Sequence, residues 1–98
     1  MIINVCYSQQ KSYRKVKRES NTFFGIEDKK RNIFEYKGML ISYGKNAIQI
    51  NTLLSENVDF CFLVELINSV FKNCVIGISG IPSDKQTMGF KDVNVFWI

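Results

Sequence analysis

The sequence contains no histidine, and no metal, phosphate-loop or nucleophile motif takes its place. Histidine is the usual general base near neutral pH and the commonest metal ligand. Its absence therefore excludes most common catalytic classes. The glycines give no nucleotide site, because the segments around Gly77 and Gly44 complete neither a dinucleotide fingerprint nor a phosphate loop. We expect no enzyme activity, no cofactor, no metal and no small-molecule substrate.

Proline, cysteine and long apolar runs are also scarce. One proline and six glycines in 98 residues leave no linker, so a single domain over residues 1–98 is expected. Three cysteines without a CxxC pair or a basic leader favour reduced, buried thiols in the cytoplasm. We expect Cys6 and Cys61 to be buried and Cys74 to be more accessible. The apolar stretch Phe60–Phe71 is too short for the roughly 20 residues that cross a bilayer.

The positive charge lies mostly in the first half of the chain. The net charge is +4, but residues 1–45 hold ten Lys or Arg against four acids. Residues 46–98 hold three against five. This asymmetry favours a partner with an acidic or polyanionic surface.

Several segments have the short length and β-prone composition of strands. They are Met1–Tyr7, Thr22–Glu27, Ile33–Tyr36, Met39–Tyr43, Ala47–Ile50, Cys74–Ser79 and Lys91–Ile98. Glycine-containing connections of two and three residues at 37–38 and 44–46 predict an antiparallel meander. Trp97, beside the chain end, requires the last strand to be docked.

One segment, Ser55–Lys72, has clear helical periodicity. Leu63 and Ile67 belong to an apolar stripe that recurs at three- and four-residue spacing. Phe62 and Leu66 widen the stripe, and they are either covered by other segments or form an exposed patch. The fold class expected is α+β, a mostly antiparallel β-sheet with one main amphipathic helix (about residues 56–72) packed on one face.

A basic segment is the strongest candidate for a partner-binding surface. Its residues are Lys11, Tyr13, Arg14, Lys15, Lys17 and Arg18. The surrounding stretch, Gln9–Asn21, fits a strand, a helix or a loop equally well. Cations can pair with phosphates or acidic side chains, and a tyrosine can stack on a base. The alternative is a solvated edge that prevents aggregation. The loop Gly80–Gly89 is a second candidate for recognition or a plain connection.

The size of the chain, its charged and aromatic surface and its missing catalytic groups favour a protein that binds another macromolecule. In size and general build it is similar to immunity proteins of contact-dependent growth inhibition systems, although no motif carries this likeness. The resemblance implies an inhibitor that neutralises a cognate bacterial toxin. A phage-encoded inhibitor of a host defence protein is the other kind of inhibitor that the size and surface of the chain favour. Because the chain is basic, we expect it to bind outside a cationic active site, or to use its acidic second half.

Two other functions remain open from the sequence. The basic segment 11–18 would make the chain a nucleic-acid-binding module with strong salt dependence. A histidine-free ribonuclease would use Lys, Arg, Tyr and Glu, somewhat as small basic ribosome-dependent toxins do. Glu19, Glu27 and Glu35 are the carboxylates available in the basic half, and their spacing does not pair them.

Overall fold

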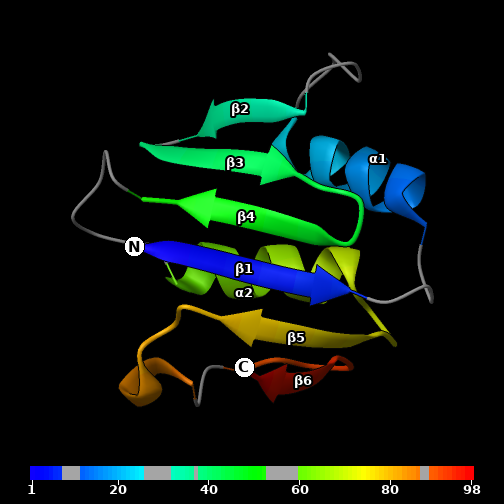
Figure 1. Ribbon diagram of the computed structural model, residues 1–98. Helices are drawn as coiled ribbons and strands as arrows, with labels where there is room; N and C mark the ends of the chain where they lie inside the picture. The colour runs from blue at the N-terminus through cyan, green and yellow to red at the C-terminus, as the bar shows by residue number, and fades with distance from the viewer. Residues whose placement is uncertain (8–11, 26–31, 37, 53–59, 87–88) are drawn as a thin grey trace.

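The computed structural model describes residues 1–7, 12–25, 32–36, 38–52, 60–86 and 89–98. In chain order the elements are β1 (Ile2–Tyr7), α1 (Tyr13–Phe24), β2 (Ile33–Tyr36), β3 (Met39–Tyr43), β4 (Ala47–Asn51), α2 (Phe60–Val70), β5 (Val75–Ser79), a short 3-10 turn (Ser83–Lys85) and β6 (Asn94–Trp97). The described strands form one sheet in the order β2-β3-β4-β1-β5-β6 (Figure 1).

The α+β fold with a mostly antiparallel sheet is confirmed. Strands β2, β3 and β4 form the expected meander. Strand β1 lies between β4 and β5 and is antiparallel to both, so α2 connects two parallel strands that flank β1. The pairing of β5 with β6 is parallel. Helices α1 and α2 both lie behind the sheet as drawn, and no described helix covers its other face (Figure 1).

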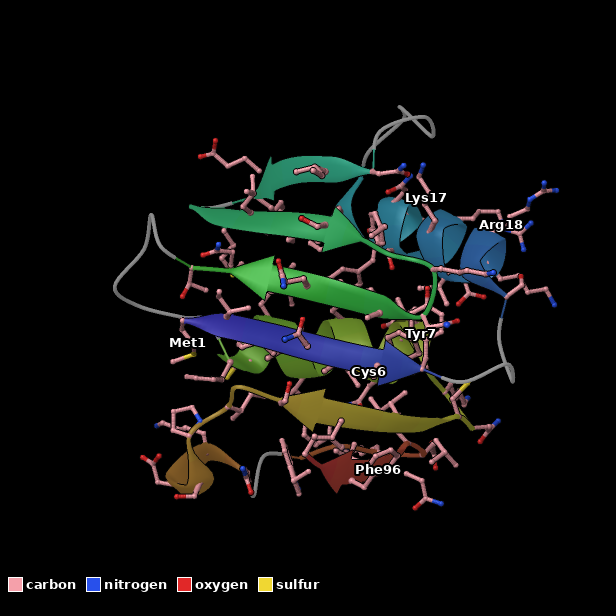
Figure 2. All side chains as sticks on the ribbon, in the orientation of Figure 1. Met1, Cys6, Tyr7, Lys17, Arg18 and Phe96 are labelled. Carbon is pink, nitrogen blue, oxygen red and sulfur yellow. The ribbon has the colours of Figure 1, made fainter. Side chains whose placement is uncertain are left out.

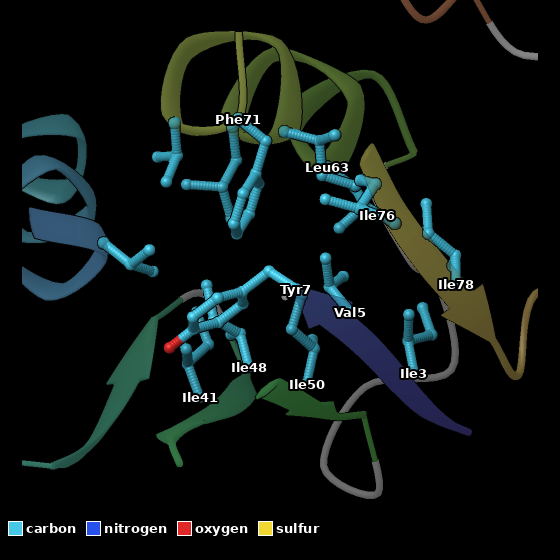
Figure 3. Close-up of a cluster of buried hydrophobic side chains, with 14 of the residues drawn as sticks. Ile3, Val5, Tyr7, Ile41, Ile48, Ile50, Leu63, Phe71, Ile76 and Ile78 are labelled. Carbon is cyan, nitrogen blue, oxygen red and sulfur yellow. The ribbon is translucent and has the colours of Figure 1, made fainter. Parts of the chain in front are cut away.

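The core lies between the sheet and the two helices, and it follows the alternation of each strand. Ile3, Val5 and Tyr7 of β1 point into it, as the period of two predicts. Leu63 and Ile67 of α2 face them, with exposed fractions of 3% and 0%. Figure 3 shows Leu63 of α2 meeting the three β1 side chains between the helix and the strands. The Tyr7 ring contacts Phe71, and its hydroxyl donates to the Gly44 carbonyl over 3.1 Å.

Two expectations about helices need correction. The prediction of a strand over Thr22–Glu27 is wrong, because Thr22–Phe24 form the last turn of α1. Gly25 ends that helix in the left-handed conformation, with φ of 73°, and donates its backbone N–H to carbonyls of the last turn. The main helix ends at Val70, two residues earlier than predicted, and its predicted start at Ser55 lies outside the described residues.

Helix α1 starts where the sequence offers a cap. The Ser12 hydroxyl accepts a hydrogen bond from the Lys15 backbone N–H over 3.3 Å. Val16, fully buried, and Phe23 and Phe24, both half-buried, fix the inner face of the helix. Between them the inner face carries Ser20, an unusual core residue. The predicted change from the undecided stretch Gln9–Asn21 to a strand at Thr22 therefore falls inside one continuous helix.

Ser20 provides a test of this packing. Its side chain is 0% exposed, and its Oγ has no hydrogen-bond partner among the described residues. Since an unsatisfied buried hydroxyl destabilises the fold and alanine has the higher helix propensity, Ser20→Ala should raise the free energy of unfolding by about 1 kcal/mol. Urea unfolding followed by circular dichroism measures the change. Ser69→Ala, on the exposed side of α2, is the control and should gain only the propensity difference, about 0.5 kcal/mol. Equal gains would contradict the burial of Ser20.

Candidate partner-binding surface

Helix α1 carries most of the predicted basic surface on its outer side. Arg14, Lys15 and Arg18 are exposed, and Lys17 is half-buried. Residues three and four positions apart are neighbours on a helix, so Arg14, Lys17 and Arg18 share one side. Figure 2 shows Lys17 and Arg18 projecting from α1. The buried Val16 anchors the opposite side of the helix in the core. The backbone that carries the cations is therefore held in a fixed position on the domain.

A shallow groove of about 630 Å³ runs beside the first turn of α1. It is lined by Ser12, Arg14, Asn32, Tyr43 and Lys45. Lys45 is exposed and lies in the turn between β3 and β4, so it brings a cation from a second element to the same groove as Arg14. The lining therefore combines two cationic groups with polar side chains that can donate hydrogen bonds to an anion.

A hydrogen bond ties the helix to the sheet beside this groove. The Lys17 ammonium donates to the Asn32 amide oxygen over 2.8 Å. The Asn32 carbonyl in turn accepts from the Tyr43 backbone N–H over 2.7 Å. These contacts fix one rim of the groove against β3. Lys17 is thus engaged within the domain, whereas Arg14, Lys15 and Arg18 extend from its exposed side.

The structure brings most, but not all, of the predicted surface together. Arg14, Lys15, Lys17 and Arg18 lie on one helix, which is one of the three conformations considered for this segment. Lys11 lies outside the described residues. Tyr13 begins α1, but its side chain lies outside the described part, so base stacking by this ring remains a prediction. Lys45 was missed, because nothing in the sequence indicates that a turn about thirty positions away meets the helix.

Of the three thiols expected to be buried, the structure buries one. Cys61 is exposed on α2, where the prediction was burial. Cys74 is buried, although it was expected to be the more accessible thiol. Cys6 is half-buried, on the sheet face opposite the core. Apolar neighbours in sequence do not predict burial here. Cys61 lies on the exposed side of α2, whereas Cys74 is buried directly before β5, between the exposed Asn73 and Val75.

The apolar stripe of α2 is covered, and α1 contributes much of the cover. Leu66 is buried, and the half-buried Phe62 packs in a cluster with Phe23, Phe24 and Tyr36. The Phe62 ring stacks on Tyr36 with centroids 4.9 Å apart and contacts Phe23 at 5.2 Å. Phe62 and Leu66 therefore form no exposed patch, and the cover comes from a helix that the sequence did not reveal.

The remaining candidates give no catalytic constellation among the described residues. No group of three or more metal-binding side chains occurs in the described part. Glu19 lies on α1 and Glu35 on the edge strand β2, while Glu27 and residues 87–88 of the predicted recognition loop lie outside the described part. None of the described helices has the length and apolar character needed to span a bilayer.

Comparisons with protein-family models, with curated proteins and with solved structures found no match to this chain.

Proposed function

We propose that this chain is a small, non-enzymatic, cytoplasmic inhibitor that binds another protein through the outer side of α1. The observation that carries the proposal is the set of three exposed cations, Arg14, Lys15 and Arg18, on a helix whose opposite side is anchored in the core. Lys45 extends this surface from the sheet. Several cations held on one folded surface favour an acidic partner and speed its association.

The partner proposed is a toxin or a component of a defence system, and the contact is with an acidic region of its surface. A basic helix would be repelled by the cationic active site of a nuclease. The inhibitor therefore binds beside such a site, where it blocks access sterically or holds the enzyme in an inactive conformation. A contact of standard size takes about 800 Å² from each partner, which α1, the groove and the β3–β4 turn supply together with neighbouring surface.

Binding of nucleic acid is the second candidate, and the groove beside Arg14 favours it. Arg14, Lys45, Ser12 and Asn32 all line this groove, so it offers two cations and two further hydrogen-bond donors to a phosphate. Base stacking on α1 has less support, because Phe23 and Phe24 pack into the aromatic cluster. This leaves backbone contacts, which predict weak sequence preference and steep loss of affinity with salt. The ribonuclease hypothesis gains no support from the described carboxylates.

Charge reversal on α1 tests the proposal. The double variant Lys15→Glu/Arg18→Glu should weaken binding of the captured protein partner by about tenfold or more, because it turns attraction into repulsion. The partner is captured from nuclease-treated native lysate, identified by mass spectrometry and then titrated in purified form. Since both residues are exposed, the thermal midpoint should hardly move.

The matched control is Lys72→Glu/Lys91→Glu, which changes the net charge equally at exposed positions outside α1. It should retain the partner. Equal binding by both double variants would refute the role of α1. A fluorescent RNA or DNA duplex titrated across a salt series is the second arm. Recovery of nucleic acid alone, with tight salt-dependent binding lost in the α1 variant, would replace the inhibitor by the nucleic-acid module.

A further inference from the structure

The sheet face opposite the helices carries an unusual set of exposed side chains. Its described residues are Ile2, Asn4, Cys6, Ile33, Glu35, Leu40, Ser42, Ala47, Gln49, Asn51, Val75, Gly77, Ser79, Asn94, Phe96 and Ile98. Six of the large apolar residues that the structure leaves exposed belong to this set. In Figure 2 the view is onto this face, with Cys6 and Phe96 labelled. We call it the open face.

The strand register arranges the open face in bands. Ser42, Gln49, Asn4 and Ser79 pair across β3, β4, β1 and β5 and form a polar row. The Gln49 amide donates to the Asn4 amide oxygen over 3.3 Å within this row. On one side of the row lies a first band, in which Leu40 and Ile2 flank Asn51 and Glu35 pairs with Leu40 at the sheet edge. On the other side lies a row through Ala47, Cys6, Gly77 and Phe96.

The second band, on the other side of the polar row, is built around Gly77. A Cβ at this position would lie 2.8 Å from Phe96 Cε2 and 2.7 Å from Ile98 Cδ1, so both side chains rest on the glycine backbone. They nevertheless remain 54% and 70% exposed. Two large apolar side chains are thus held on the surface of the domain with most of their outer area facing water.

The open face is also nearly free of charge. Among its described residues Glu35, on the edge strand β2, is the single charged side chain. The cations Arg14, Lys15 and Arg18 lie on α1, in the layer behind the sheet. The chain has a net charge of +4, so two copies repel each other if their basic helices meet. Two copies that meet through the open face keep these cations apart. Several large apolar side chains exposed on one face are typical of a protein interface.

A second copy of the chain matches this face in pattern and size. A twofold axis parallel to the sheet places one polar row over the other and the exposed apolar side chains of each band over a band of the second copy, as a self-complementary interface requires. The described Cα atoms extend 35 Å by 32 Å by 19 Å, and the smallest extent corresponds to the two layers. Contact over most of the sheet therefore approaches the roughly 800 Å² per partner of a standard interface.

We propose that two copies of this chain pack open face against open face, as a four-layer dimer with the two sheets inside and α1 of each copy outside. Facing sheets lie about 10 Å apart in such packing, so Phe96 and Leu40 become buried. The proposal is independent of the partner proposed above. It leaves both basic helices exposed, so the dimer presents that surface twice.

Sedimentation velocity between about 1 µM and about 300 µM measures the assembly, which follows mass action. The wild-type chain should sediment as a dimer at the upper concentrations. Leu40→Glu and Phe96→Asp, at opposite bands, should each remain monomeric, because each buries an unpaired charge in the contact. The control Ser69→Glu places the same kind of charge on the exposed side of α2 and should dimerise normally.

Two native thiols give a test that requires no variant. Cys6 lies on the open face, and Cys61 is exposed on α2. The rate at which a small thiol reagent labels Cys6, followed by peptide mass spectrometry, should fall about tenfold over the same concentration range, while labelling of Cys61 stays constant. A wild-type monomer at about 300 µM, a dimer that persists in both open-face variants, or unchanged labelling of Cys6 would overturn the proposal.

Discussion

Replacing Ile67 by aspartate is expected to unfold the domain. Ile67 is 0% exposed and lies on the side of α2 that packs against the sheet. An unpaired carboxylate in that position loses its hydration and finds no compensating charge among the described core residues, which costs several kcal/mol. A domain of this size has a free energy of unfolding of only about 5–15 kcal/mol. The substitution therefore removes much or all of the stability of the domain. Circular dichroism and a urea titration measure the result.

The controls separate burial of the charge from its effect on the helix itself. Ser69→Asp adds the same side chain two residues later, on the exposed side of α2, and should cost less than about 1 kcal/mol. Leu63→Asp, at a position 3% exposed one turn earlier, should behave like Ile67→Asp. A variant at Ile67 that keeps the wild-type midpoint would show that α2 does not pack on the sheet as described.

The sequence predicted the elements whose pattern depends on their own residues. Strand β1 and the meander were predicted correctly because alternation and glycine turns are local signals. Helix α2 was found for the same reason. For α1 the sequence left a strand, a helix and a loop equally open, because Ser20 and Asn21, both buried, interrupt the apolar stripe that runs from Val16 to Phe24. A period cannot be recognised when polar residues occupy its buried positions.

The basic surface of α1 and the open face also differ in how far the sequence alone could predict them. The cations of α1 are adjacent in sequence, so the basic segment was visible without a structure. Lys45 joins them only because the β3–β4 turn meets the start of the helix. The banding of the open face depends on register between strands that are distant in the chain, such as Leu40 with Asn51 and Asn51 with Ile2. Composition and periodicity contain no information about such pairings.

Gly80→Ala is the second substitution for which a large loss of stability is expected. Gly80 follows β5 with φ of 89°, a left-handed conformation that disfavours residues with a Cβ. A Cβ added there would overlap the carbonyl oxygen of Ile2 and lie 3.2 Å from the Cα of Ile3. These are backbone atoms of the central strand β1, which cannot move without disturbing its pairing with β4 and β5.

Gly25→Ala separates the two contributions, because Gly25 shares the left-handed conformation, with φ of 73°, but has nothing within 4 Å of the added Cβ. Its variant should lose about 1–2 kcal/mol, the cost of the backbone conformation alone. Gly80→Ala should lose about 3 kcal/mol or more, since the steric overlap adds to the same cost. Urea unfolding of both variants measures the difference. Equal losses would mean that the chain after β5 does not approach the start of β1 this closely, and that the β1–β5 pairing at the centre of the sheet is looser than described.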